Sequence, residues 1–271
     1  MVAVEELKRK VEALFDEGRI SRFLGFKSVA GRAIPYLFSK DELADLAFSN
    51  ERYPVAIIMD ALNSKSDEPV GVLVRACDER AIVEHIKNNK LDKDRVVLVG
   101  VACDEQTATE CRCPRPYPSV DFAGERVDVE PDRSRIEAVE KMSYADRLKF
   151  WSDWFSRCLK CYGCRNICPM CFCTTCSLED EKLGGRFDVP PAFPAWHLIR
   201  AFHMIGRCVD CGLCELVCPA SIPLRTIYKK VREISGEVLD YLPGEQPDAP
   251  LPLEVLGDGT YELPPDMQEE G

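Results

Sequence analysis

PVGVLVRACDERAIVEHIKNNKLDKDRVVLVGVACDEQ, residues 69–106, decides the fold of the first half of the chain. Two β-branched runs, Val70–Val74 and Val96–Val101, flank a stretch with helical character. Continuously apolar runs are typical of parallel strands that are covered on both faces. Parallel neighbours need a crossover connection, which is usually a helix. The stretch therefore predicts a β-α-β unit in a small parallel sheet.

The same phrase, Ala-Cys-Asp-Glu, follows each predicted strand. If the strands are neighbours, Cys77 and Cys103 leave the same sheet edge with backbones roughly 5 Å apart. Ligands bind at that carboxyl edge in open parallel sheets. Cys111 and Cys113 follow soon after in a proline-rich loop. The four thiols either converge on this edge or are separate buried thiols, a common state for isolated cysteines.

The charge of the chain is concentrated at its end. Its 271 residues carry a net charge of −11, and residues 240–271 contain nine acidic residues and no Lys or Arg. The remaining body has 37 acidic residues, 46 minus those nine, against 35 basic ones. A nearly neutral body argues against nucleic acid as the main partner, since phosphate binding requires a basic excess.

No apolar run approaches the roughly 20 residues of a membrane-spanning helix. The start, MVAVEELKRK, also lacks the apolar stretch of a signal peptide. We therefore expect a soluble, cytoplasmic protein with no direct membrane insertion.

Fifteen cysteines in such a chain indicate metal ligation or redox chemistry, because disulfides are reduced in the cytosol. Eleven of them lie between Cys158 and Cys218, where the pattern C-x-x-C-x-x-C-x-x-x-C-P occurs twice. The two copies consist of Cys158, Cys161, Cys164, Cys168 and Pro169, and of Cys208, Cys211, Cys214, Cys218 and Pro219. This pattern is typical of [4Fe–4S] clusters, whereas structural zinc usually uses two separated C-x-x-C pairs.

A four-iron cluster needs four converging thiolates, of which one short loop can present three. In two-cluster ferredoxins the fourth comes from the other motif. We therefore assign the first cluster to Cys158, Cys161, Cys164 and Cys218. The second cluster is assigned to Cys208, Cys211, Cys214 and Cys168.

Seven cysteines remain outside these sets. Cys77, Cys103, Cys111 and Cys113 are candidates for a third iron–sulfur cluster that exchanges electrons with the other two, and unligated thiols are the alternative. Cys171, Cys173 and Cys176 have no evident fourth partner. They could hold a metal or cluster with an outside ligand, or they could be buried thiols beside the first clusters.

Residues 158–219 resemble a bacterial two-cluster ferredoxin domain with an insertion between the motifs. WHLIRAFHMIGRCVDCGLCELVCPASIPL, residues 196–224, is similar to iron–sulfur subunits of heterodisulfide reductase-like, formate dehydrogenase and membrane electron-transport complexes. VRACDERAIVEHIKNNKLDKDRVVLVGVAC, residues 74–103, resembles the beta-subunit family of deazaflavin-reducing hydrogenases and formate dehydrogenases. These resemblances imply one-electron transfer.

The sequence thus predicts three parts. Residues 1–135 form an α/β domain with a small parallel sheet, and residues 136–235 form a mainly helical ferredoxin-like domain with two [4Fe–4S] clusters. Residues 236–271 form an extended, acidic, proline-rich tail, either disordered or laid as a strap over this protein or a partner.

The remaining candidates favour packing over ligation. The aromatic side chains before the first motif are interpreted as a helix face that keeps the first cluster dry; they are Trp151, Trp154 and Phe155. The histidines are interpreted as packing or surface residues; they are His85, His197 and His203. Four polar residues beside the predicted sheet edge could contact a cofactor, but capping of helices is preferred; they are Asp78, Arg80, Asp104 and Glu105.

We expect an iron–sulfur electron-transfer subunit of an anaerobic multi-subunit oxidoreductase, of hydrogenase, formate dehydrogenase or heterodisulfide reductase-like type. Its partners are other redox subunits, and it need not bind a substrate itself. The alternative is a flavin- or deazaflavin-dependent beta subunit that feeds electrons into its own clusters. A cluster-stabilised assembly protein is a third class.

Overall fold

The computed structural model describes residues 2–113, 115–130, 132–180, 188–192 and 194–252, and the structural statements below concern these residues. Its first half contains a six-stranded mixed sheet in the order β2-β1-β4-β5-β6, with β3 paired to β1. The strands are β1 (Arg22–Val29), β2 (Arg32–Phe38), β3 (Leu46–Ala47), β4 (Val70–Val74), β5 (Val96–Val101) and β6 (Phe122–Ala123).

The predicted β-α-β unit is present. Strands β4 and β5 pair in parallel from Val70 opposite Val96 to Val74 opposite Gly100. Helix α3 (Ala76–Lys87) connects them, together with a short 3₁₀ turn, η2 (Lys93–Arg95). Every residue of β4 is buried, as its unbroken apolar run indicated.

The sheet is larger than the small parallel sheet that the sequence predicted, and it is mixed. Strand β1 is parallel to β4 and β6 is parallel to β5, but β2 and β3 run antiparallel to β1. Ala30 and Gly31 connect β1 to β2 with φ angles of 51° and 78°. Two consecutive positive φ angles are the geometry of a tight hairpin whose twist matches its strands.

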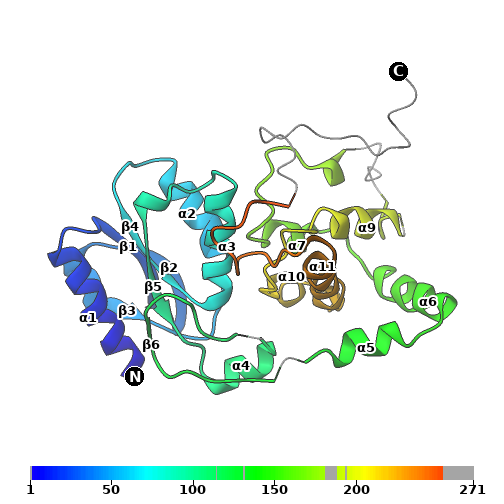
Figure 1. Cartoon of the computed structure of the whole chain (residues 1–271), viewed down its shortest axis with the longest axis horizontal. Coiled ribbons are helices and arrows are strands. Elements are labelled where there is room, and N and C mark those ends of the chain that lie inside the picture. Colours follow the sequence, from blue (N-terminus) through cyan, green and yellow to red (C-terminus); the bar gives the residue numbers. More distant parts are fainter. Residues whose placement is uncertain (1, 114, 131, 181–187, 193, 253–271) are drawn as a thin grey trace.

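Helices cover both faces of the sheet, as Figure 1 shows. Helix α1 (Val2–Asp16) contacts β5 and β6, while α2 (Val55–Asn63) packs against α3 on the other side. Leu7 and Val11 of α1 are fully buried. After Ser39 the chain forms a 3₁₀ turn, η1 (Lys40–Asp45), at whose start Ser39 and Glu42 form a capping box.

The second half of the chain is built from helices and loops beside α3 (Figure 1). Helix α4 (Glu105–Cys111) closes the first half. The helices that follow it are α5 (Ser134–Glu140), α6 (Tyr144–Phe155), α7 (Gly163–Asn166), α9 (Ala195–Phe202), α10 (Leu213–Leu216) and α11 (Leu224–Leu239), with a 3₁₀ turn η3 (Ser177–Glu179).

The segment after α11 returns to α3 and packs on it (Figure 1). Tyr241 is buried and donates a hydrogen bond from its hydroxyl to Glu84 Oε1 at 2.6 Å, and Gly244 N donates to the same oxygen at 2.8 Å. The described part of the predicted strap therefore lies on this protein. Residues 253–271 of the predicted tail lie outside the described residues.

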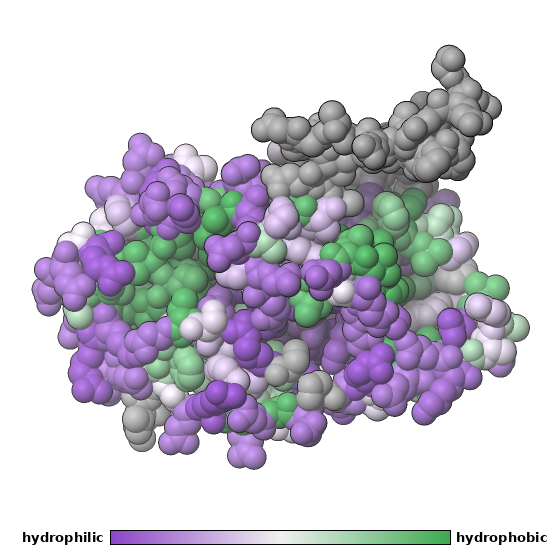
Figure 2. All heavy atoms as spheres, viewed as in Figure 1, coloured by the Kyte–Doolittle hydropathy of each residue, from purple (hydrophilic) through white to green (hydrophobic). Residues whose placement is uncertain are grey.

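Polar side chains dominate the face seen in Figure 2, apart from hydrophobic areas such as the one at the position of α11. Ile234, Val238 and Leu239 of α11 are exposed, together with Leu242 just beyond it. Among the described helices, none has the length and apolar character needed to cross a membrane.

Candidate iron–sulfur centres

The two cysteine motifs follow the same backbone path. In the first motif Lys160 and Tyr162 have φ angles of 48° and 57°, and Tyr162 starts the one-turn helix α7. Asp210 and Gly212 stand at the equivalent places of the second motif, with φ angles of 51° and 72° before α10. Left-handed conformations cost non-glycine residues roughly 1–2 kcal/mol each. Their repetition indicates that both loops are shaped around the same kind of ligand set.

Two cavities lie at these loops, and each is bordered by four cysteines drawn from both motifs. The first is bordered by Cys158, Cys161, Cys164 and Cys218, and the second by Cys168, Cys208, Cys211 and Cys214. These are the two crossed sets assigned from the sequence. Four thiols around one cavity fit the donor set of a [4Fe–4S] cluster.

The second cavity is the more deeply buried of the two. Cys168 and Cys208 are buried, whereas Cys161 at the first cavity is exposed. Burial raises the pKa of the Cys208 thiol to about 12 and also raises the pKa values of Cys158 and Cys164. Bound iron replaces the proton of such a thiol, which couples cluster binding to thiol deprotonation.

Aromatic side chains border the first cavity, and of the three that the sequence indicated only Phe155 packs directly against this border. Trp196 and His197 of α9 line it, and Phe155 stacks on the imidazole of His197 with ring centroids 3.7 Å apart. Trp151 and Trp154 are only partly buried and pack against the core. Phe155 therefore supports the cavity wall from behind.

The buried histidines have the predicted packing role. His85 is fully buried, its Nε2 lies 2.7 Å from the carbonyl oxygen of Pro169, and its ring meets Phe172 edge-on. His197 is also buried, and burial lowers its pKa to about 4. His203 at the end of α9 is exposed.

The four cysteines of the first half lie near the second motif. Cys77 lies at the start of α3, and Cys103 lies just after β5. Cys111 is the last residue of α4, and Cys113 lies in the loop that follows it. The pKa of Cys103 is raised to about 12, mainly by burial, with Arg75 lowering it and the nearby Cys113 and Cys111 contributing to the rise. Cys77 is instead within electrostatic reach of Cys211 in the second motif. A separate cavity beside Cys103 is bordered by Phe48, Asn50, Glu105 and Gly124.

Three arginines bridge these two groups of cysteines. Arg52 Nη1 donates to the carbonyl oxygen of Cys211 at 2.6 Å, and Arg80 Nε donates to that of Val209 at 3.0 Å. Arg80 Nη2 also lies 3.9 Å from Cys113 Sγ. Arg225 donates to the carbonyl oxygen of Cys111 and to the carboxylate of Asp210, the latter at 2.7 Å. Isolated Arg residues carry no motif, so the sequence did not indicate these links.

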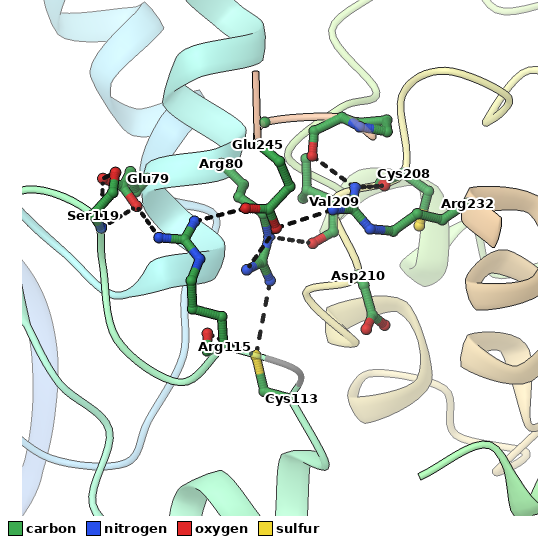
Figure 3. A network of polar contacts seen from close by, with 12 residues as sticks. Glu79, Arg80, Cys113, Arg115, Ser119, Cys208, Val209, Asp210, Arg232 and Glu245 are labelled. Atoms are coloured by element: carbon green, nitrogen blue, oxygen red, sulfur yellow. Dashed lines mark hydrogen bonds and ion pairs between the residues drawn. The ribbon is translucent and has the colours of Figure 1, made fainter. Parts of the chain in front are cut away.

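Glu245, in the segment after α11, contacts three arginines at the junction between the α/β region and the second motif, as Figure 3 shows. Its carboxylate lies 3.6 Å from Arg80, 2.9 Å from Arg115 and 3.1 Å from Arg232. Arg232 in turn donates to the carbonyl oxygen of Cys208 at 3.2 Å. One carboxylate therefore joins α3, the loop after α4 and α11 beside the second cavity.

The predicted capping roles of two acidic residues are confirmed. Asp104 accepts a hydrogen bond from Thr107 N at 2.7 Å at the start of α4. Asp78 accepts one from Arg75 N at 3.1 Å at the start of α3.

The three extra cysteines share a further cavity. Cys171, Cys173 and Cys176 border it together with Arg165, Arg200 and Arg207. Across the part of the chain that the structure describes, no group of three or more His, Cys, Asp or Glu side chains could hold a single metal ion.

The chain is similar to beta subunits of formate dehydrogenases. It is 40% identical over 97 residues to the F420-dependent formate dehydrogenase subunit beta of Methanocaldococcus jannaschii, a match that covers 36% of this chain and 26% of that relative. It is also 40% identical over 106 residues to the F420-dependent formate dehydrogenase 1 subunit beta of Methanococcus maripaludis, which covers 39% and 27%. The match thus spans about a quarter of the length of each relative. No family model matches the chain.

Proposed function

We propose that this protein is an iron–sulfur electron-transfer subunit of a formate dehydrogenase-type oxidoreductase complex. Residues 136–235 are its two-cluster ferredoxin-type domain, with the α/β region of residues 1–135 beside it. The relatives support the kind of complex, since both are beta subunits of formate dehydrogenases. Other redox subunits of that complex are its partners.

One observation carries the proposal: each of two cavities is bordered by three cysteines of one motif and the last cysteine of the other. This crossed arrangement gives each site four thiolates and places the two sites beside each other. Bound [4Fe–4S] clusters would supply one-electron transfer. The chain itself supplies the thiolates, the burial and the hydrogen bonds that set reduction potentials.

The second site is the one closest to the α/β region. Arg52 and Arg80 donate to carbonyl oxygens within the second motif, and Arg80 also reaches Cys113 Sγ. We propose that Cys77, Cys103, Cys111 and Cys113 belong to a third centre that exchanges electrons with the second site across this junction. The raised pKa of Cys103 and its electrostatic proximity to Cys111 and Cys113 support the grouping of those three.

The crossed assignment can be tested by comparing single Cys→Ser variants of the anaerobically purified protein. The EPR spectrum and the reduction potential of Cys218→Ser are expected to change in the same way as those of Cys158→Ser. Those of Cys168→Ser are expected to match Cys208→Ser. If Cys218→Ser instead matched Cys214→Ser, each motif would hold its own cluster and the proposed arrangement would be wrong.

A flavin- or deazaflavin-binding subunit is the second candidate, and the cavity beside Cys103 favours it. This cavity lies past the carboxyl end of β5, where open sheets bind ligands. Asp104, Glu105 and Glu125 also border it and count against this candidate, because these carboxylates repel the phosphate groups of such a cofactor. A yellow chromophore that copurifies in stoichiometric amount would decide for this candidate.

A further inference from the structure

Beyond the two ferredoxin-type sites, the cavity at Cys171, Cys173 and Cys176 combines three thiols with three guanidinium groups. Arg200 Nη1 donates to Cys171 Sγ at 3.2 Å, and Arg207 Nη1 donates to Cys173 Sγ at 3.6 Å. The third cation, Arg165, borders the same space. Guanidinium groups aimed at sulfur favour the thiolate form, which is the form that binds metals.

Arg200 has a donor without a partner at this cavity. Its side chain is 3% exposed, and its Nη2 donates to the carbonyl oxygen of Cys164 at 2.8 Å. Its Nε has no hydrogen-bond partner among the described residues. A buried donor that stays unsatisfied costs about 1–3 kcal/mol. A sulfide or thiolate inside the cavity would accept this bond.

We propose that Cys171, Cys173 and Cys176 supply three thiolates to an additional iron–sulfur cluster in this cavity. A cluster is larger than one ion, so its thiolates border a cavity instead of meeting at one point. The three thiols border one cavity here, as the four thiols of each ferredoxin-type site do. His203 borders the same cavity and gives the set an additional donor.

The negative charge of thiolates and sulfides explains the cations around this cavity. Arg200 contacts Cys171 and the carbonyl oxygen of Cys164, so it stands between this site and the first cluster site. It also lies within electrostatic reach of Cys168, a ligand of the second site. The additional cluster would therefore adjoin both ferredoxin-type clusters, and it goes beyond the function proposed for them.

Thiol alkylation of the unmodified, anaerobically iron-loaded protein tests the proposal. Cys161 and Cys173 are both exposed, so either thiol should react readily with iodoacetamide when it is free. We expect peptide mass spectrometry to find Cys171, Cys173 and Cys176 protected, and to find all three modified after a chelator has removed the iron. Cys161 is the matched control, because it is also exposed but belongs to the first ferredoxin-type site.

The control separates the two proposals. Alkylation of Cys173 in the loaded protein while Cys161 stays protected would overturn the additional cluster and leave the ferredoxin-type pair intact. Alkylation of Cys161 as well would count against the pair itself.

A second measurement uses the variant with Cys171→Ser, Cys173→Ser and Cys176→Ser together. It is expected to lose about four irons and four sulfides per chain while keeping the EPR signals of the two ferredoxin-type clusters. The control is Thr175→Ala, which changes a lining residue that is not a thiol and should leave the iron content unchanged. An unchanged iron content in the triple variant would contradict the proposal.

Discussion

At the junction of the two halves, single residues carry charges and make close contacts, so single substitutions there should change the stability of the protein. Gly244 has a φ angle of 77°, and a Cβ at this position would lie 2.3 Å from Arg80 Cβ and 2.5 Å from its carbonyl oxygen. Gly18 has a similar φ angle of 67° but nothing within 4 Å of such a Cβ. The two glycines thus separate backbone strain from steric overlap.

We predict that Gly244→Ala lowers the free energy of unfolding by about 2–4 kcal/mol, because strain and overpacking add. Gly18→Ala should cost about 1 kcal/mol from its backbone conformation alone. Urea denaturation of both variants measures the difference. Equal losses would show that the returning segment does not press on α3 as described.

Glu245 faces three arginines with one carboxylate, so its charge matters more than that of a surface residue. We predict that Glu245→Gln destabilises the protein by about 2–4 kcal/mol, because it leaves three guanidinium groups without their shared counter-charge. Glu17→Gln removes the exposed pair with Arg19 and should change stability by less than about 0.5 kcal/mol. Thermal denaturation of both variants checks the contrast, and a similar small shift for each would contradict it.

At the scale of elements, the sequence predicted those helices and strands that show a clear local hydrophobic pattern. The strands Val70–Val74 and Val96–Val101 are where their apolar runs placed them. The hairpin of β1 and β2 was not predicted, since its strands contain Gly25 and Pro35 and its turn is Ala30–Gly31. Propensity is weak for such strands, and their pairing with the sheet depends on tertiary contacts.

For the candidate sites too, the sequence indicated the local ligand motifs but not the contacts between distant residues. The spacing of the motif cysteines indicated three thiols of each set, and the fourth was assigned from the pattern of two-cluster ferredoxins. Neither the cations at Cys171 nor the bridge of Arg52, Arg80 and Arg225 could be predicted. Each is made by residues far apart in sequence, as the bond from Arg52 to Cys211 illustrates.

The returning segment is an element whose contribution can be measured by truncation. A chain that ends at Leu239 loses Tyr241, Gly244 and Glu245 and their bonds to α3. A chain that ends at Pro252 keeps all of them. We predict a lower melting temperature and faster loss of iron for the shorter chain only. Equal behaviour of the two truncations would mean that the segment from residue 240 to 252 does not stabilise the junction.

At the scale of the whole molecule, the cysteine sites form a connected arrangement. The second site adjoins the cysteines of the α/β region through Arg52 and Arg80, and the first site adjoins the cavity at Cys171 through Arg200. Under the proposed function, electrons that enter at either end would pass through the crossed pair to reach the other. This arrangement suits a subunit that connects redox partners, and it makes the crossed pair the central claim.

Iron and acid-labile sulfide analysis, combined with EPR of the dithionite-reduced protein, tests that claim most directly. It should be performed on the anaerobically purified variant in which Cys77, Cys103, Cys111, Cys113, Cys171, Cys173 and Cys176 are all replaced by Ser. We predict about eight irons and eight sulfides per chain, with the signal of two magnetically coupled [4Fe–4S] clusters. Zinc in place of iron, or a single uncoupled cluster in a folded protein, would contradict the account.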